Sequence, residues 1–263
     1  ILFRFLSQAG SPSLPDSVIT LPSAEIRSSR LALFAAGHRN EDTEIKGSLQ
    51  HASLSGLLSS SGSVYQKMYA AGMLSTTSIR GGSAQHTSVL WNGIRLDSPM
   101  NGQNDLSLLP VFMFDNIRIQ YGGGTAIWGS GALGGSIHLN NQDPEPGQGV
   151  SGSFMAGTLG ELGSLIRVSH ASNRVSASFR YFSLNSRNQY RFMVPGSESG
   201  LMKIQEHASY FQHGILAESQ ISMGTHGKLD LKWWYQESDR NIPPAVFQSH
   251  MASHQKDNHH RFM

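Results

Sequence analysis

The second half of the chain alternates apolar and polar residues, which is the pattern of β-strands with one apolar and one polar face. In the stretch 175–181 the apolar positions are Val175, Ala177, Phe179 and Tyr181, and in the stretch 229–235 they are Leu229, Leu231, Trp233 and Tyr235. Opposite the second set lie Asp230, Lys232 and Gln236, with Trp234 as the one apolar exception. This alternation fits a tilted transmembrane β-strand between lipid and water, and it fits equally a strand of a soluble two-sheet sandwich.

The turn signals between these stretches predict about six strands after residue 148. Short turns are expected near Asn173 and at 224–227, and longer loops at 185–205 and from Ser238 onward. Short turns at one end and long loops at the other are typical of outer-membrane barrels. The aromatic run at 233–235 is a candidate for the girdle that such barrels place at the membrane surface.

The first half of the chain has a mixed pattern, which predicts a small α+β domain. Leucines at helical spacing favour a helix over 48–58, whose expected role is packing. The stretches 89–96 and 117–121 have the pattern of short strands. A turn rich in proline and glycine at 142–148 separates this domain from the alternating region. The predicted fold is therefore an α+β domain followed by antiparallel strands.

A glycine-dense segment at 122–139 closes the first domain with a tight turn that leads into a strand at 136–139. Within it, Gly129, Gly131 and Gly134 satisfy the GxGxxG spacing of dinucleotide-binding folds. That chemistry needs a helix N-terminus after the glycines to face the pyrophosphate. Here a strand follows, and then a proline-containing turn that cannot continue a helix. The motif therefore does not indicate a nucleotide site.

Several blocks of the first half, taken in order, resemble the plug domain of TonB-dependent outer-membrane transporters. They are 79–81, 85–96 (QHTSVLWNGIRL), 105–110 (DLSLLP), 117–119 and the glycine segment. The wording most similar to cobalamin-receptor-like members from Bacteroidota is LWNG at 90–93, SPMNGQNDLSLLP at 98–110 and WGSGALGG from Trp128. The chain departs from the family at 121–123, where Tyr-Gly-Gly stands in place of the usual Arg-Gly-Pro.

The resemblance implies a plug domain over 16–145, preceded at 1–15 by an N-terminal extension or signal remnant and followed at 146–263 by the first strands of an outer-membrane β-barrel. The plugged barrels of this family need about 22 strands, and the residues after 145 are too few for that number. Open strand edges in lipid would leave backbone groups unpaired. The barrel is thus expected to be incomplete in this chain. Either the sequence is truncated, which we favour, or another chain completes the barrel.

The resemblance also implies active uptake of a large, scarce nutrient of the cobalamin kind across the outer membrane, with the plug facing the periplasm. The energy-coupling protein TonB would open the plug by pulling on an N-terminal segment, the TonB box. The candidate for that box is Asp16, Ser17, Val18, Ile19 and Thr20, because a short extended run can add as a strand to a partner's sheet. The same run could be the first core strand of a domain, and a competing register lies at 25–30.

Two other classes of function remain open from the sequence. One is a structural or receptor subunit of an outer-membrane complex, whose plug docks a partner without transport. The other is a soluble β-rich binding protein.

Matching the family's blocks places the outward-facing plug loops at 65–74 and 97–104. The candidate substrate-binding residues in these loops are Tyr65, Tyr69, Met73, Met100, Asn101, Gln103 and Asn104. Their aromatic, apolar and neutral amide side chains fit a large, mostly neutral ligand better than a strongly anionic iron chelate. Arg80, expected on a strand after the first loop, would need a carboxylate partner and is expected to be structural.

Composition narrows the remaining possibilities. The chain has no cysteine, so it has neither a disulfide nor a thiolate metal site. Its formal charge of +2 is spread without a basic run, which argues against nucleic-acid binding. No apolar run approaches the roughly 18 to 20 residues that a membrane-spanning helix needs.

Histidines near the carboxyl end suggest a metal site, because helical i, i+4 spacing would place His250 and His254 on one face, with His259 and His260 following. We expect none, since no acidic or cysteine ligand completes the set and the segment is expected in an exposed loop. The hydrolase motifs GxSxG and HExxH do not occur, so neither an enzyme nor a cofactor is predicted. The expected partners are TonB, outer-membrane lipid and a surface lipoprotein.

Overall fold

The computed structural model describes residues 39–43, 47–62, 64–98, 100, 102–194, 196, 200–224, 227–244 and 253–263. These residues belong to one compact unit of the chain, which runs from Phe34 to Met263. The predicted extension at 1–15, the TonB-box candidate at 16–20 and its competitor at 25–30 lie outside the described residues. The domain limits at 15 and 145 stay predictions.

The first part of the described chain is a small α+β domain around a five-stranded sheet, in the order β1-β6-β7-β4-β5. Its strands are β1 (Arg39–Thr43), β4 (Thr87–Trp91), β5 (Ile94–Arg95), β6 (Asn116–Tyr121) and β7 (Gly135–Asn140). β4 and β7 run parallel, and the other neighbours are antiparallel. Two further strands, β2 (Tyr65–Met68) and β3 (Ser75–Ser78), form a separate antiparallel hairpin.

Short helices lie between these strands: η2 (Gly47–His51), α1 (Leu54–Ser61), η3 (Ala84–His86), η4 (Leu106–Leu108), η5 (Val111–Met113), α2 (Thr125–Trp128) and η6 (Ser130–Ala132). The helix predicted over 48–58 is split in two, because Ser53 caps a new helix and its Oγ accepts a hydrogen bond from the Gly56 N–H at 3.3 Å. That helix ends at Gly62, whose φ of 65° suits glycine. Its buried leucines confirm the expected packing role.

The stretch 89–96, predicted as one strand, is a hairpin instead. β4 ends at Trp91 and β5 begins at Ile94, and the turn between them is formed by Asn92 and Gly93, with φ of 46° and 89°. Asn-Gly is the favoured sequence for a tight turn with positive φ at both central residues. The strands predicted at 117–121 and 136–139 are confirmed by β6 and β7.

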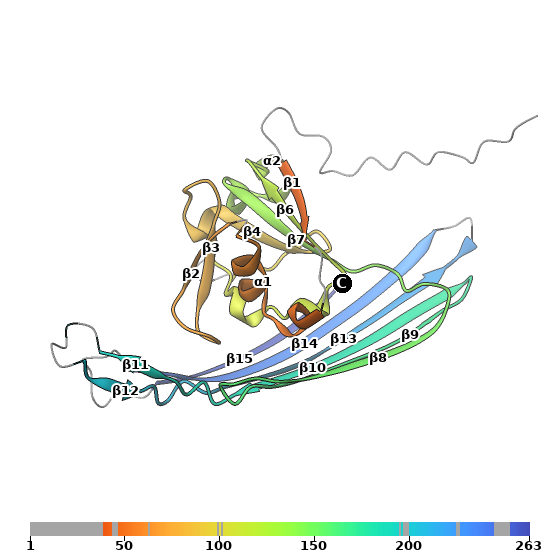
Figure 1. Ribbon diagram of the computed structural model, residues 1–263. Helices are drawn as coiled ribbons and strands as arrows, with labels where there is room; N and C mark the ends of the chain where they lie inside the picture. The colour runs from red at the N-terminus through yellow and green to blue at the C-terminus, as the bar shows by residue number, and fades with distance from the viewer. Residues whose placement is uncertain are drawn as a thin grey trace, which may run out of the picture. The chain divides into compact units, whose positions relative to one another are not determined.

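A second sheet follows, in which six long strands lie side by side and curve together (Figure 1), in the order β15-β14-β13-β10-β9-β8. The strands are β8 (Gly147–Ala156), β9 (Leu162–Ala171), β10 (Val175–Ser186), β13 (Tyr210–Ser222), β14 (Lys228–Ile242) and β15 (Ser253–Phe262). All neighbours are antiparallel, as predicted. The connection predicted as a loop at 185–205 contains a small hairpin of β11 (Arg191–Met193) and β12 (Met202–Ile204). Among the described residues the sheet is not closed into a barrel.

The middle strands β9, β10, β13 and β14 each have an exposed face and a more buried face, whereas β8 and β15, at the two edges of the sheet, have no buried residue. The exposed face carries many apolar residues, among them Val150, Phe154, Ile166, Val168, Phe179, Ile221, Leu229, Leu231 and Trp233. The buried face shares one hydrophobic core with the first domain, to which the strands contribute Leu165, Phe182, Leu184, Leu216 and Trp234. The ring of Trp234 lies 5.4 Å from Trp91 and 5.5 Å from Phe114, centroid to centroid. Trp234 therefore faces the first domain, and the prediction that it belongs to the aromatic girdle is wrong.

The prediction of a loop from Ser238 onward is wrong. β14 runs to Ile242, and β15 pairs with it from Trp233↔Phe262 to Ile242↔Ser253. Polar residues stand on both faces of β15, so its sequence lacks the apolar alternation by which the other strands are recognised. No helix of the described residues has the length and apolar character needed to cross a membrane.

Candidate ligand-binding site

The β2–β3 hairpin presents aromatic side chains at the surface. Tyr65 is 70% exposed and Tyr69 is 64% exposed. Together with Lys67, Leu74 and Gln103 they line a groove of about 440 Å³. The Lys67 ammonium lies 5.2 Å from the centre of the Tyr69 ring, which is a cation–π distance. The structure thus brings three of the predicted ligand-binding residues, Tyr65, Tyr69 and Gln103, into one concave surface.

The other predicted ligand-binding residues are placed differently. Met100 is 95% exposed, whereas Met73 is 5% exposed and offers almost no surface to a ligand. Asn101 lies outside the described residues. We therefore leave Met73 out of the ligand surface that is proposed below.

Asp97 fixes the loop 97–104 to the neighbouring strands. Its carboxylate accepts hydrogen bonds from the Ser88 hydroxyl at 3.3 Å and from the Val89 N–H at 3.4 Å, and it forms an ion pair with Arg95. The side-chain amide of Asn104 donates to the same carboxylate. Asn104 is thus engaged in holding its own loop.

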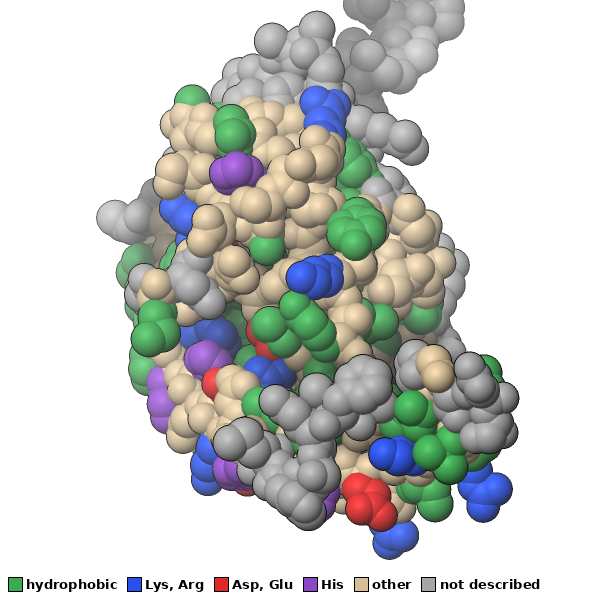
Figure 2. Space-filling model, turned by 90° about the vertical axis from the view of Figure 1, so that its left-hand side faces the viewer, with side chains coloured by type: hydrophobic (Ala, Val, Ile, Leu, Met, Phe, Trp, Pro, Cys, Tyr) green, Lys and Arg blue, Asp and Glu red, His purple; other side chains and the backbone are tan. Residues whose placement is uncertain are grey.

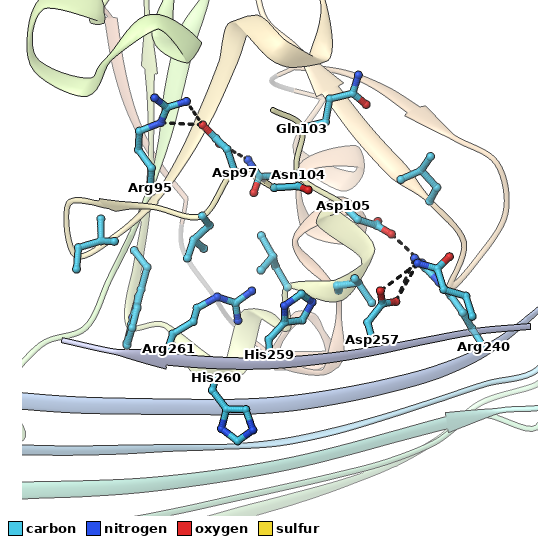
Figure 3. Close-up of a pocket in the computed structure, with 18 of the residues that line it drawn as sticks. Arg95, Asp97, Gln103, Asn104, Asp105, Arg240, Asp257, His259, His260 and Arg261 are labelled. Carbon is cyan, nitrogen blue, oxygen red and sulfur yellow. Dashed lines mark hydrogen bonds and ion pairs between the residues drawn. The ribbon is translucent and has the colours of Figure 1, made fainter. Parts of the chain in front are cut away.

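A second cavity of about 730 Å³ lies between loops of the first domain and the face of β14 and β15 that is turned towards them (Figure 3). Arg240 reaches from β14 to Asp105 at 2.7 Å and to Asp257 at 3.6 Å. Arg261 lies over the Trp234 ring, 4.2 Å from its centre. Both signs of charge therefore line this cavity. Figure 2 shows the face that carries β2 and β3, where basic, acidic and histidine side chains gather in a hollow.

A chain of ion pairs joins the first domain to the strands. Asp115 contacts Arg167 at 2.8 Å and Arg180 at 2.5 Å, and Glu218 contacts Arg180 at 3.5 Å and Lys232 at 2.9 Å. Burial alone would raise the pKa of the Asp115 carboxyl, but the charge and hydrogen bond of Arg180, a backbone amide and the charge of Arg167 together hold that pKa below its usual value. Asp115 is therefore an ionised anchor of the first domain on the strands.

The carboxyl-terminal histidines group into no metal cluster within the part of the chain that the structure describes. His250 lies outside that part, and His254, His259 and His260 lie on β15 instead of the expected exposed loop. The His254 Nε2 lies 2.6 Å from Asp239 Oδ1. His259 and His260 point to opposite sides of the sheet (Figure 3), because successive residues of a strand alternate between its faces.

Sequence reasoning missed the residues that hold the first domain on the strands. For Arg180 the available signal was the alternation, since it occupies a polar position of a predicted strand, whereas Arg240 lies in the stretch predicted as a loop from Ser238 onward. The alternation does not tell which partners these arginines meet. Arg80, expected on a strand, follows β3 in an exposed turn with φ of 54°.

Comparison with known proteins defines the class. Residues 41–136 match the family model of the TonB-dependent Receptor Plug Domain. Over these residues the first domain matches a TonB-dependent receptor plug domain, and the strands after it have the fold of the plugged receptors of the outer membrane. The outer-membrane localisation predicted from the sequence is confirmed on this basis.

The particular relatives are transporters or receptors rather than enzymes. The Vitamin B12 transporter BtuB of Vibrio vulnificus (strain YJ016) is 40% identical over 68 residues, which are 26% of this chain and 11% of that protein. The ferric-catecholate import receptor Fiu from E. coli K12, in its closed form, superposes with a TM-score of 0.57 at 14% identity, over 78% of this chain and 27% of Fiu. The ferripyoverdine receptor of Pseudomonas aeruginosa superposes with a TM-score of 0.55 at 16% identity, over 68% of this chain and 22% of the receptor.

The chain therefore spans about a tenth of the length of the curated relative and less than a third of these solved structures. That relative comes from Vibrio and not from Bacteroidota, so the narrower resemblance drawn from the sequence stays a prediction.

Proposed function

We propose that this chain is the plug and the first barrel strands (β8, β9, β10, β13, β14 and β15) of a TonB-dependent transporter. The transporter takes up a large, scarce nutrient of the cobalamin or ferric-siderophore kind. The observation that carries the proposal is a plug domain, matched over 41–136, that is docked by buried ion pairs on the buried face of antiparallel strands. The relatives support the ligand class, since their names specify vitamin B12, ferripyoverdine and a ferric catecholate.

The proposed ligand surface is the groove of Tyr65, Tyr69 and Gln103. The exposed Met100 is proposed as a further ligand contact. Aromatic rings contribute large contact areas at little entropic cost, and the Gln103 amide adds neutral hydrogen bonding. Among the described residues, Lys67 is the one charged side chain that lines this groove. A large amphiphilic ligand fits this lining, and within that class we favour a cobalamin-like ligand, because a relative that is 40% identical over 68 residues is a vitamin B12 transporter.

Energy coupling is proposed to act through the segment Asp16–Thr20. A pull from this side reaches β1 first, because β1 is the first described strand of the chain. β1 pairs with β6 over five residues at the edge of the plug sheet, and an edge strand is held by a single neighbour. The exposed apolar face of β8, β9, β10, β13 and β14 is proposed to contact outer-membrane lipid, and a surface lipoprotein is proposed to contact the outer loops.

The test is uptake of cyanocobalamin and of ferripyoverdine by cells that lack their own transporters and carry the full-length protein. We expect uptake of one of the two, and deletion of 16–20 should reduce it to the level of cells without TonB. Deletion of 25–30 is the control, because it removes the competing register. Loss of uptake with deletion of 25–30 alone would move the box to that register. Ligand binding without uptake in every variant would favour the docking subunit over the transporter.

A further inference from the structure

The tip of the β2–β3 hairpin, Ala71 and Gly72, is held by residues of the six-stranded sheet and of the connections between its strands. This sheet (β8, β9, β10, β13, β14 and β15) is called the wall below. The side-chain amide of Asn188 donates to the Ala71 carbonyl at 2.9 Å, and the Arg240 guanidinium donates to the Gly72 carbonyl at 3.4 Å. The Tyr210 ring lies against Gly72 so closely that an added Cβ would stand 2.2 Å from it. Two hydrogen bonds and one ring contact thus fix two consecutive residues of the tip.

Asn188 connects more than the hairpin. It is fully buried, and its amide also donates to the Ala208 carbonyl at 3.1 Å, at the other end of the connection between β10 and β13. Its backbone N–H donates to the Leu159 carbonyl at 3.0 Å, in the turn between β8 and β9. Its φ of 51° is one that asparagine tolerates better than most residues. Asn188 therefore ties two outer connections of the wall to the plug hairpin.

Arg240 connects the hairpin to the rest of the plug. Its ion pair with Asp105 is buried, and the Asp105 carboxylate accepts a hydrogen bond from the Ser75 N–H at 3.0 Å, where β3 begins. The same carboxylate accepts the Ser107 N–H at 3.1 Å, which starts η4. The hairpin is thus held at its tip and at the first residue of its second strand.

We propose that Asn188 and Arg240 are positioning residues for ligand binding, which hold the hairpin so that Tyr65 and Tyr69 are presented in one orientation. The proposal rests on the proposed function, because it takes the groove beside these tyrosines as the ligand site. A hairpin with four paired residues on each strand is marginally stable by itself. Ordering it before the ligand arrives removes an entropic cost from binding.

The test compares Asn188→Gly and Asn188→Asp in the full-length protein in detergent. Glycine keeps the backbone angle and removes the side-chain amide, whereas aspartate keeps the shape but places a carboxylate beside two carbonyl oxygens. Asn173→Gly and Asn173→Asp are matched controls, because Asn173 is exposed in the turn between β9 and β10. Tyr69→Ala removes a ligand contact without touching the tip, and Arg240→Lys keeps the charge but loses the planar guanidinium.

Two quantities are measured, namely hydrogen exchange of residues 69–74 and the affinity for cyanocobalamin and ferripyoverdine. The Tyr69 and Met73 amides, which close the hairpin on Leu74 and Ala70, should exchange faster in both Asn188 variants and in Arg240→Lys, while α1 keeps its protection. Binding should weaken about tenfold in these variants, the effect of about one lost hydrogen bond. Tyr69→Ala should weaken binding with exchange unchanged.

Unchanged exchange in both Asn188 variants would overturn the proposal, and so would faster exchange with unchanged affinity. A general loss of protection that includes α1 would also overturn it, since Asn188 would then support the fold as a whole. If the wild-type protein binds neither probe, the proposed ligand class fails, and the exchange data still decide whether Asn188 and Arg240 hold the hairpin.

Discussion

At the scale of single residues, Gly72 and Gly62 separate two effects that restrict a position to glycine. Both have positive φ, 71° and 65°, but an added Cβ at Gly62 meets nothing within 4 Å, whereas at Gly72 it would meet the Tyr210 ring. Gly62→Ala should reduce the free energy of unfolding by about 1 kcal/mol, from backbone strain alone. Gly72→Ala should lose about 1 to 3 kcal/mol more, because the ring has to move. Denaturant unfolding in detergent measures both, and equal losses would contradict the packing described at the hairpin tip.

His138 gives the plug a defined dependence on pH. It is buried, its Nε2 lies 2.8 Å from the Ser136 hydroxyl, and its ring packs edge-on against Trp128. Burial, with a smaller effect of the Arg118 charge, lowers the pKa of His138 from 6.5 to about 4. The unfolded chain therefore binds the proton more readily between these values. The contribution of neutral His138 to the free energy of unfolding is fully present above pH 6.5. About 3 kcal/mol of this free energy is lost as the pH falls to 4.

The measurement for His138 is the free energy of unfolding from pH 7 down to about pH 3, in the wild type and in His138→Gln. The variant should lose the decline in this window and keep the decline below pH 4 that Asp115 contributes, since the pKa of that carboxyl is lowered. Parallel pH curves for the two proteins would show that His138 is not the group responsible.

At the scale of elements, β14 illustrates how neighbouring residues serve opposite faces. Trp234 is fully buried against Trp91 and Phe114, whereas Trp233 is 38% exposed on the other face and stacks on Phe262. Trp234→Ala should reduce the free energy of unfolding by about 3 to 5 kcal/mol, as for a large core aromatic. Trp233→Ala should lose clearly less, because part of its surface stays exposed. Guanidinium unfolding in detergent compares the two, and an equal loss would contradict the assignment of the faces.

The elements also show which sequence signals were sufficient. The stretches 175–181 and 229–235, which lie in β10 and β14, could be predicted as strands, and a count of about six could be predicted for the region, because alternation with period two and turn residues are local signals. β15 could not, because polar residues stand on both of its faces. The turn at Asn92 and Gly93 is signalled locally by the Asn-Gly pair itself, which divides the stretch 89–96 into two strands. Trp234 looked like an exception because its partner, Trp91, lies far away in the sequence.

At the scale of the whole molecule, the blocks of the plug predicted the fold class, and no local signal predicted how the plug is held. The pairs Asp115–Arg180 and Asn188–Ala71 join residues more than 60 positions apart. Which cation meets which anion is decided by sheet register and curvature, which a single sequence does not contain. The predicted loops at 65–74 and 97–104 did contribute Tyr65, Tyr69 and Gln103 to one groove, while the burial of Met73 depends on the folding of the hairpin.

The central claim is that the groove beside the β2–β3 hairpin binds the transported nutrient, and equilibrium binding to the full-length protein in detergent tests it most directly. Cyanocobalamin and ferripyoverdine are titrated against the wild type, the double variant Tyr65→Ala/Tyr69→Ala, and a control, Tyr181→Ala, on the opposite face of the wall. We predict that one probe binds the wild type and the control alike, and that the double variant binds it at least about tenfold more weakly. Binding of that probe with the same affinity by the double variant, or of neither probe by the wild type, would contradict the claim.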